Sequence, residues 1–359
     1  MVKGLSLLSG GLDSMLAICV LRDQGIQMEA VVFKSPFFGT ASAQKAAQAL
    51  NVPLHIIDFS DEILRLVRKP PHGFGGAMNP CIDCHAAMIR RAGDFMREQG
   101  YDFVSTGEVL NQRPMSQNRR SLETVAADSG LEGLLLRPLS AQLLSPTTPE
   151  TDGRVDRSRL LALQGRQRQP QMELAAHFGI REYPSPAGGC LLTEKGFCRK
   201  LRDLYDHTEG IPPVRDVELL RFARQFRLPD GGRIIVGRNR TDNAALKALA
   251  DEGRTLLYPV NIPGPTIAVL GEINEADLFR AAGIAAGYGD SGTRTDITVR
   301  VITPRGTREL TVRPLPRDVF TPWIPPPPPA VKSLQRPVPL NASNRSAHEG
   351  VTRTNKSGK

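Results

Sequence analysis

The sequence predicts an α/β fold: a parallel sheet with helices on both faces, followed by a smaller α+β domain and a C-terminal tail. Three observations support this prediction. Over residues 1–136, short apolar runs alternate with longer helical stretches, which is typical of βαβ units. The composition, 40% hydrophobic and 23% charged, is ordinary for a folded chain. The length of 359 residues exceeds what one hydrophobic core usually organises, so two domains are expected.

The elements of the first domain follow from apolar runs and from glycines that end helices. Strands are predicted at residues 5–8, 30–33, 54–58, 103–105 and 134–136. Helices are predicted at residues 14–24, 41–50, 86–99 and 122–129. Gly25, Gly100 and Gly130 stand where three of these helices should end. Ligands of parallel sheets bind beyond the carboxyl ends of the strands, so we look for chemistry in those loops.

Domain boundaries are predicted from clusters of turn-forming and charged residues. Residues 140–170 and 207–216 are such weak points, and the predicted domains are residues 1–205 and 213–320. The tail, residues 321–359, contains five consecutive prolines and little apolar surface, so we expect it to be disordered. Its six Lys and Arg against one Glu supply +5 of the net charge of +9. It is either a solvated tail or a non-specific RNA-binding arm.

Two broad classes of protein are disfavoured by the sequence. It has no apolar stretch of about 18 uncharged residues, and its first apolar run turns quickly into glycines, so neither a membrane span nor a signal peptide is expected. The default compartment is the cytoplasm, where thiols stay reduced. The basic excess suggests an anionic partner.

A glycine-containing loop after the first strand is suited to a polyphosphate. Gly10 and Gly11 allow a tight turn that presents amide donors, and Ser9 and Ser14 add hydroxyls at the start of a helix. Asp13 would orient the loop or hold a Mg²⁺ ion. A plain strand-to-helix turn would need neither the acid nor both serines. The usual P-loop and dinucleotide-binding patterns are absent.

The hexapeptide SGGLDS at residues 9–14 resembles the signature of the PP-loop ATP pyrophosphatases, which have a Rossmann-like (adenine nucleotide alpha hydrolase) fold. Further stretches make residues 1–205 similar to tRNA thiouridine synthetases of the 4-thiouridine and 2-thiouridylase types: NPCIDC at 79–84, TGE at 106–108, QRPMSQ at 112–117 and PAGGC at 186–190. The resemblance implies an ATP-dependent tRNA sulfurtransferase. Such an enzyme adenylates a uridine carbonyl, releases pyrophosphate and replaces the oxygen with sulfur.

The resemblance also implies which residues meet the nucleotide. Thr106, Gly107 and Glu108 follow the fourth predicted strand and should face the adenine, ribose or phosphates. Phe33, at the end of the second strand, is a further candidate for nucleotide binding. The stretch at residues 112–117 either holds the nucleotide or the target base, or is an exposed loop.

Three cysteines are candidates for the sulfur chemistry. Cys81 and Cys84 form a CxxC at the start of a helix, where the amide field favours thiolate, and Cys190 lies in a distant glycine turn. Three thiolates suit a 4Fe-4S cluster with one iron open to sulfide, as in some members of the resembling families. A persulfide relay without iron, through Cys81 or Cys84 and Cys190, is the first alternative. The enzyme's expected sulfur donor is sulfide or a persulfide-carrying protein. A zinc site completed by His85 is the second.

The remaining cysteines and His85 have simpler interpretations. Cys19 lies among apolar residues of the first helix and should be a buried small hydrophobe. Cys198 is expected to be a spare thiol. His85 is interpreted as a surface residue at a helix start rather than a ligand.

The second domain carries a different resemblance. VGRN at residues 236–239, PGP at 263–265, a small-residue helix around 281–287 and a strand at 296–301 resemble the RNA-binding domain of NFACT proteins over residues 213–314. The family's tryptophan-containing stretch is LLY here, and its histidine before the glycine is lacking. Arg238, Asn239 and Arg240 suit phosphate contacts, or else form a solvated loop. Such a module would supply affinity for tRNA outside the active site.

Two other functions remain open: a PP-loop ligase that forms amides, and a non-catalytic protein that binds nucleotide and RNA. The absence of a glutaminase segment disfavours the first, and the intact loop and cysteines disfavour the second.

Overall fold

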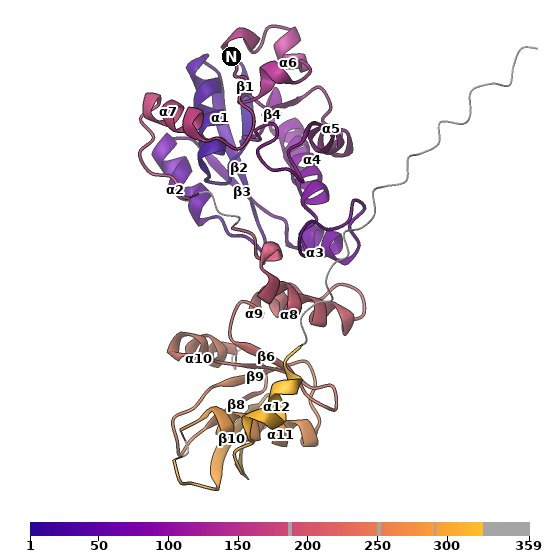
Figure 1. Ribbon diagram of the computed structural model, residues 1–359, viewed down its shortest axis with the longest axis vertical. Helices are drawn as coiled ribbons and strands as arrows, with labels where there is room; N and C mark the ends of the chain where they lie inside the picture. Colours follow the sequence, from indigo (N-terminus) through magenta and orange to yellow (C-terminus); the bar gives the residue numbers. More distant parts are fainter. Residues whose placement is uncertain (186–188, 250–252, 291, 326–359) are drawn as a thin grey trace, which may run out of the picture. The chain divides into compact units, whose positions relative to one another are not determined.

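The structure is a computed structural model that describes residues 1–185, 189–249, 253–290 and 292–325 (Figure 1). The described residues belong to one compact unit that contains two separate sheets, one of five strands and one of six. Among these residues, no helix has the length and apolar character needed to cross a membrane.

The first sheet is entirely parallel, with the strand order β3-β2-β1-β4-β5. Its strands are β1 (Lys3–Leu7), β2 (Gln27–Lys34), β3 (Leu54–Asp58), β4 (Phe103–Ser105) and β5 (Leu135–Leu136). The helices of this part are α1 (Leu12–Asp23), α2 (Ala41–Leu50), α3 (Ser60–Arg68), α4 (Cys81–Gln99), α5 (Arg119–Ser129), α6 (Thr148–Thr151), α7 (Gln169–His177), α8 (Lys195–Asp206) and α9 (Val214–Leu219). The predicted Rossmann-like parallel sheet is confirmed.

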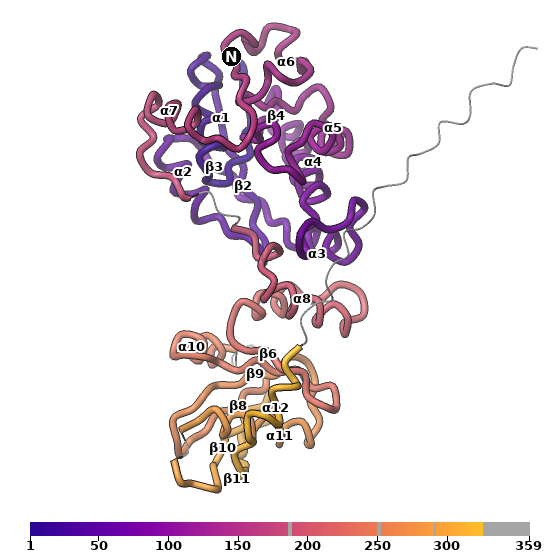
Figure 2. The backbone as a smooth tube through the Cα atoms, in the orientation of Figure 1, coloured from indigo at the N-terminus to yellow at the C-terminus, as the bar shows by residue number. Residues whose placement is uncertain are grey.

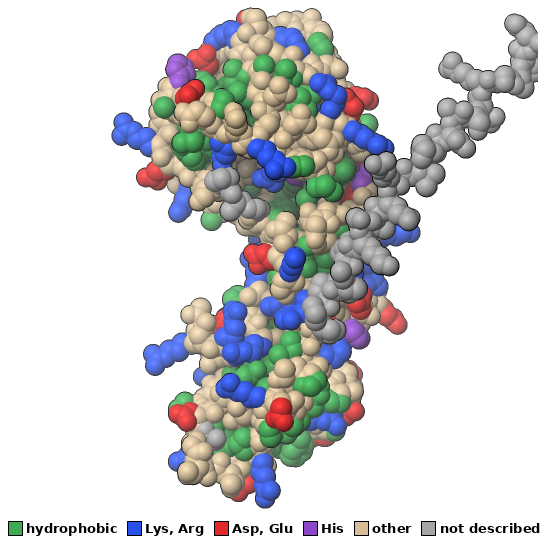
Figure 3. Space-filling model, viewed as in Figure 1, with side chains coloured by type: hydrophobic (Ala, Val, Ile, Leu, Met, Phe, Trp, Pro, Cys, Tyr) green, Lys and Arg blue, Asp and Glu red, His purple; other side chains and the backbone are tan. Residues whose placement is uncertain are grey.

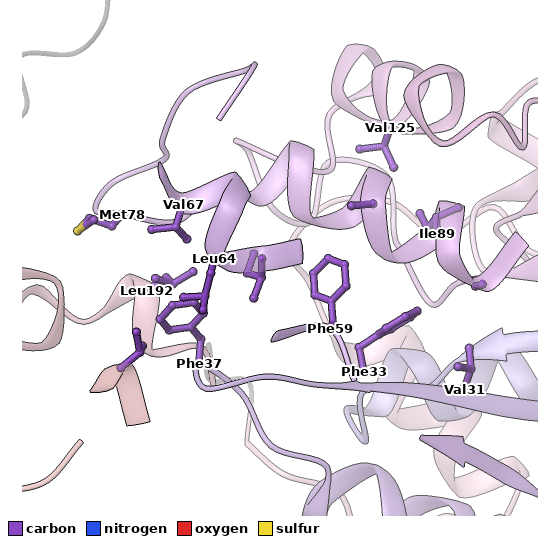
Figure 4. Close-up of a cluster of buried hydrophobic side chains, with 14 of the residues drawn as sticks. Val31, Phe33, Phe37, Phe59, Leu64, Val67, Met78, Ile89, Val125 and Leu192 are labelled. Atoms are coloured by element: carbon purple, nitrogen blue, oxygen red, sulfur yellow. The ribbon is translucent and has the colours of Figure 1, made fainter. Parts of the chain in front are cut away.

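Helices cover both faces of this sheet because successive strand side chains point to opposite sides. In β2, Val31 and Phe33 join a core with α3, α4, α8 and α9, part of which Figure 4 shows. Ala30 and Val32 join the opposite core, with α1, α2 and α7. The near-continuous apolar sequence of β2 follows from this two-sided burial.

The second sheet is antiparallel, with the order β11-β10-β8-β9-β7-β6. Its strands are β6 (Arg224–Arg227), β7 (Arg233–Val236), β8 (Leu256–Pro259), β9 (Ile267–Leu270), β10 (Ile297–Thr303) and β11 (Gly306–Val312). Its helices are α10 (Arg240–Lys247), α11 (Glu275–Tyr288) and α12 (Arg317–Phe320). The small residues of α11 allow close packing on the sheet, where Ala281, Ala285 and Ala286 are fully buried.

The structure differs from the sequence prediction in several elements. Helix α4 begins at Cys81 rather than at residue 86, so both cysteines of the CxxC lie inside the helix. Helices α3 and α7 were not predicted, although the strong amphipathic pattern of α3 could have revealed it. The stretch 140–170, expected to be a weak point, packs on the first sheet through Ala141, Val155 and Leu160.

The boundaries of the predicted parts also shift. Val214, Val217 and Leu220, in or beside α9, belong to the core of the first sheet, although the second domain was predicted to begin at residue 213. Figure 2 shows the chain passing through α8 before it enters β6. Residues 321–324 were assigned to the tail, yet Trp323 and Ile324 pack against the core of the second sheet. The rest of the predicted tail, residues 326–359, lies outside the described residues.

Candidate functional site

The loop between β1 and α1 has the geometry of an anion-binding turn. Gly10 adopts a positive φ of 84°, which glycine alone adopts without strain. The Ser9 and Ser14 hydroxyls lie 3.2 Å apart, and the Ser14 hydroxyl donates to the Gly11 carbonyl over 2.8 Å. Helix α1 starts directly after this turn, and no side chain caps its first amides. Those amides therefore remain available to an anionic ligand.

Two glycines allow other chain segments to approach this loop. A Cβ on Gly10 would lie 2.4 Å from the backbone carbon of Ser42, at the start of α2. A Cβ on Gly107 would lie 2.5 Å from the backbone of Asp13 and Ser14. The segment after β4 thus rests directly on the loop after β1. Gly107 therefore lies at the same edge of the sheet as residues 9–14, while the contact of Thr106, Gly107 and Glu108 with a nucleotide stays a prediction.

Asp13 is held by one oxygen and left without a partner at the other. Its Oδ2 accepts a hydrogen bond of 2.8 Å from Gln112 Nε2, whereas its Oδ1 is buried and has no hydrogen-bond partner among the described residues. A buried carboxylate oxygen without a donor is costly unless a ligand or cation satisfies it. Gln112, for which both a ligand contact and an exposed loop were open, orients Asp13.

Glu108 is the centre of a buried polar cluster. Its carboxylate accepts from Arg137 Nε (2.8 Å), His85 Nδ1 (3.1 Å) and the Thr106 hydroxyl (3.0 Å). Burial opposes ionisation, but Arg137 and His85 outweigh it and hold the pKa of Glu108 well below its usual range. The Glu108 carboxylate is therefore taken up by its protein partners. Its role is to hold the segment that carries Gly107 against the loop of residues 9–14.

This cluster connects the loop to the cysteine helix. His85 directly follows Cys84 in α4, and its side chain is half-buried against Glu108, so it differs from the solvated residue expected at a helix start. The sequence interpretation missed Arg137. It directly follows β5, and the rule that polar residues at strand ends face the ligand edge could have identified it.

Phe33 lies in the hydrophobic core rather than in the loop. Its ring packs edge-on against Phe59 with centroids 5.5 Å apart, and only 4% of the residue is exposed (Figure 4). Its predicted contact with the nucleotide stays a prediction, and the side chain visibly contributes to packing.

The three candidate cysteines come together from distant segments. The Met78 amide, in the loop before α4, donates to the Leu192 carbonyl, just after Cys190, over 3.2 Å. Burial raises the pKa of Cys84 well above its usual value, and the neighbouring Cys190 and Cys81 thiols raise it further. Residues 186–188 of the PAGGC stretch lie outside the described residues, whereas Gly189 and Cys190 are described.

The expectation that the helix start favours thiolate at the CxxC does not hold for Cys84. Burial raises its pKa, and burial is also the main cause that raises the pKa of Cys190 to about 11. Both are protonated thiols at neutral pH unless a metal or cation offsets the burial. Within the described residues, no group of three or more His, Cys, Asp or Glu is placed to hold a metal ion.

The other two cysteines are structural. Cys19 is half-buried against the core with α1, and burial raises its pKa. Cys198, on α8, is buried, and its thiol lies 3.2 Å from the Leu192 carbonyl. Neither thiol has the pair of thiol neighbours that Cys84 has.

A histidine and an aspartate that the sequence interpretation missed fix the cysteine segment. Asp83, inside the CxxC, is buried and accepts from both the backbone amide and Nδ1 of His72, the latter over 2.7 Å. These bonds fasten the loop of residues 70–80 to the first turn of α4. The spacing from the CxxC gives no sequence signal for this pairing, because the loop between them is irregular.

In the second sheet domain, the VGRN stretch is partly structural. Asn239 caps α10 by accepting from the Asp242 amide (2.9 Å), and Arg238 pairs with the Asp242 carboxylate (2.8 Å). Gly237 is required because a Cβ there would lie 2.0 Å from Asn243 Oδ1. Arg240 is exposed and has no ion pair with a described residue, so it is the member of this stretch most available to a phosphate.

Two family models match the chain. Residues 1–142 match the family described as thiamine biosynthesis protein (ThiI), and residues 223–324 match the family described as NFACT protein RNA binding domain. Both resemblances inferred from the motifs are therefore confirmed. The second match ends at residue 324, which is also where packing against the core of the second sheet extends.

Curated relatives resemble the first part of the chain. The tRNA-specific 2-thiouridylase MnmA of Marinobacter nauticus is 31% identical over 124 residues, 30% of this chain and 32% of that protein. The probable tRNA sulfurtransferase of Lysinibacillus sphaericus is 29% identical over 147 residues, 38% of this chain and 34% of that protein. The chain thus spans about a third of the length of these relatives.

Solved structures resemble it more distantly. A 4-thiouridine synthetase–RNA complex with bound ATP is 19% identical with a TM-score of 0.32, covering 61% of this chain and 52% of that chain. The C-terminal part of the fibronectin/fibrinogen-binding protein from Streptococcus suis is 14% identical with a TM-score of 0.25, covering 73% of this chain and 85% of that chain.

Proposed function

We propose that this chain, in which a ThiI-type domain precedes an NFACT-type RNA-binding domain, is an ATP-dependent tRNA-uridine sulfurtransferase. The observation that carries the proposal is the physical link between the loop of residues 9–14 and the cysteines. Gly107 rests on Asp13 and Ser14, and the next residue, Glu108, binds His85, which follows Cys84. A base activated at the loop would therefore lie near the thiols.

The loop fits the pyrophosphate of ATP. Its free amides at the start of α1 and its two serine hydroxyls supply donors, and the helix dipole adds positive potential. Mg²⁺ fits the unsatisfied Oδ1 of Asp13, where it would offset the charge of the phosphates. The residues of this chain then hold the nucleotide in place and orient its α-phosphate.

The thiols fit the second half of the reaction. A uracil carbonyl oxygen attacks the α-phosphorus, and pyrophosphate leaves. A sulfur nucleophile then attacks the adenylated carbon, the bond from carbon to oxygen breaks, and AMP leaves. Cys81, Cys84 and Cys190 would bind sulfide as that nucleophile, or one of them would take the terminal sulfur of a persulfide-carrying protein, whose thiolate leaves. In the persulfide route a second cysteine would break the sulfur–sulfur bond after the attack, and a thiol reductant would open the disulfide that forms.

A 4Fe-4S cluster remains our preferred way for the three cysteines to act. The donor set is right in kind, since three thiolates hold three irons and leave the fourth open to a sulfur ligand. The buried, protonated Cys84 and Cys190 do not yet form a metal site in the described residues. The proposal of sulfur transfer does not depend on the cluster, because a persulfide relay uses the same thiols.

The test is thiolation of tRNA by the purified protein. Unmodified tRNA, Mg-ATP and sulfide should yield thiouridine, detected by mass analysis of nucleosides, together with one pyrophosphate per thiolated base. Mass analysis of tRNA from cells that lack the protein should show the corresponding loss. Pyrophosphate release with ammonia in place of sulfide, giving an aminated base, would instead identify an amide-type ligase. RNA binding without any pyrophosphate release would identify a non-catalytic binding protein.

A further inference from the structure

A cavity of about 690 Å³ lies beside Cys190 and is not used by the chemistry proposed above. Gly189 and Leu191, the two neighbours of Cys190 in the chain, both line it. Its other walls come from the loop after β2, from α8 and from the segment that leads into β6. The cavity is therefore next to the thiols and separate from the loop that would hold the ATP phosphates.

The walls of this cavity are strongly cationic. Five basic side chains line it against one acidic side chain, Glu194; they are Arg199, Lys200, Arg221, Arg224 and Arg238. Figure 3 shows Lys and Arg side chains gathered on the face in view over the segment from α8 to β6. Such a density of like charge in a concave surface focuses a positive potential.

Most of these cations are oriented by neutral groups, which leave their charge uncompensated. Arg221 donates through Nε and Nη2 to the Pro36 carbonyl, and the Lys200 ammonium donates to the Leu220 carbonyl. The Arg224 guanidinium lies 4.7 Å from the centroid of the Tyr288 ring. Among the lining cations, only Arg238 has an ion pair with a described carboxylate, that of Asp242.

Arg199 adds an unsatisfied donor. Its Nε is buried and has no hydrogen-bond partner among the described residues. Burial, together with Arg238 and Arg199, lowers the pKa of the adjacent Lys200 to about 8. Both facts describe a pocket in which positive charge is crowded and an anion would relieve the cost.

We propose that this cavity binds phosphodiesters of the substrate RNA and thereby holds the target strand beside Cys190. The inference rests on the proposed tRNA substrate and names the place where the strand reaches the sulfur site. The charges come from α8, from the turn between α9 and β6, from β6 and from the loop before α10, and thus suit an extended polyanion better than one phosphate ion. The half-buried Phe38 adds an aromatic side chain beside the cations, as in grooves that bind single strands.

The decisive experiment replaces Arg199 and Lys200 together with Gln in the full chain. Fluorescence anisotropy with a labelled tRNA should show affinity reduced at least about tenfold at 0.1 M salt. The slope of log affinity against log salt should fall by about two, one for each phosphate that the variant no longer neutralises. Binding of Mg-ATP, measured without tRNA, should stay at the wild-type level, because neither residue belongs to the loop of residues 9–14.

The matched control is the double replacement of Arg119 and Arg120 with Gln on α5. This pair is also adjacent in a helix, and Arg119 likewise donates to a backbone carbonyl, that of Leu143. Its affinity for tRNA should remain within about twofold of the wild-type value. The charge-preserving pair Arg199→Lys with Lys200→Arg should retain binding, which separates the effect of charge from the effect of packing.

The outcomes distinguish this inference from the proposed function. Wild-type affinity in the Gln pair overturns the inference, even when the wild-type protein thiolates tRNA. Reduced affinity in the Gln pair upholds it, even when the wild-type protein makes no thiouridine. Weakened binding of inorganic polyphosphate with unchanged binding of tRNA would assign the cavity to a small anion and overturn the RNA assignment.

Discussion

At the scale of single residues, Asp13 is the clearest functional signal in this chain. One carboxylate oxygen is fixed by Gln112, and the other is buried without a partner among the described residues. A protein keeps such an unsatisfied oxygen at a cost to its stability, so a ligand that satisfies it is expected.

Replacing Asp13 with Asn or Ala should therefore lower pyrophosphate release from ATP on the order of 100-fold or more, because the loop can no longer bind Mg²⁺ or orient the phosphates through this carboxylate. No apolar cavity is created, so the thermal midpoint should change little. Asp23→Asn is a control at the other end of α1, where the exposed carboxylate pairs with Arg159 at the surface. Unchanged turnover in the Asp13 variants would contradict the assignment of the loop.

A second residue-scale prediction concerns the pH dependence of RNA binding. Burial, Arg238 and Arg199 lower the pKa of Lys200 to about 8, while Asp242 and Glu194 oppose this shift. A bound phosphate would favour the charged ammonium and raise this pKa, so binding takes up a proton when the free protein has lost it. Affinity for tRNA should then decrease as the pH rises through about 8.

The measurement is a series of tRNA affinities from pH 7 to pH 9 at constant salt. Lys200→Arg keeps the charge over the whole range and should remove most of the dependence, which also corrects for titration of the RNA bases. An equal decrease in wild type and Lys200→Arg would mean that Lys200 does not meet the phosphate.

At the scale of elements, helix α4 joins the two halves of the proposed reaction. It carries Cys81 and Cys84 in its first turn, and the neighbouring His85 reaches Glu108 behind the loop. Asp83 holds the preceding loop through His72. One helix thus connects the two thiols to the segment that rests on the loop of residues 9–14.

The cysteine ligands can be identified from the metal content. Protein purified without oxygen should be brown and contain iron, and replacing Cys81, Cys84 or Cys190 with Ser should remove that iron. Cys19→Ala and Cys198→Ala are controls that should keep it, because each of these thiols lies in helix packing. Iron-free protein that still thiolates tRNA with a persulfide donor would show that a persulfide relay operates instead of a cluster. Colourless protein with an air-stable metal would indicate zinc.

At the scale of the whole molecule, α9 decides where the two parts of the chain can be separated. Val214, Val217 and Leu220 complete the core of the first sheet, whereas β6 begins the second sheet at Arg224. A cut before α9 therefore removes part of the first core, and a cut after residue 222 preserves it.

Two truncations test this boundary. A chain of residues 1–212 should unfold roughly 10 °C below a chain of residues 1–222, because three apolar side chains are missing from its core. The longer piece should keep pyrophosphate release and bind tRNA at least about tenfold more weakly than the full chain. Equal midpoints, measured by circular dichroism, would mean that α9 does not stabilise the first sheet. Equal affinity of the 1–222 piece and the full chain for tRNA would mean that the second sheet binds a partner other than tRNA.

The sequence by itself determined the features that depend on local pattern. Alternating apolar runs and helix-ending glycines predicted the strands of the parallel sheet in their order along the chain, and the helices α1, α2, α4 and α5, because burial on both faces requires those side chains. The SGGLDS loop and the CxxC were recognisable because the chemistry needs neighbouring residues at fixed spacing. The NFACT-type block was recognisable from short motifs around required glycines such as Gly237.

Only the tertiary structure decided which distant residues meet. The bond from Met78 to Leu192 brings Cys190 to the CxxC, and Glu108 finds Arg137 and His85 from three different segments. The raised pKa of Cys84 is opposite to the expectation from its helix start, because burial is the largest cause and the neighbouring Cys190 and Cys81 thiols act in the same direction. Such contacts are set by how helices and strands pack, and packing depends on the shapes of surfaces that lie far apart in the chain. A local sequence pattern does not specify which distant residues come into contact. The contacts of the site could therefore be identified only from the folded structure.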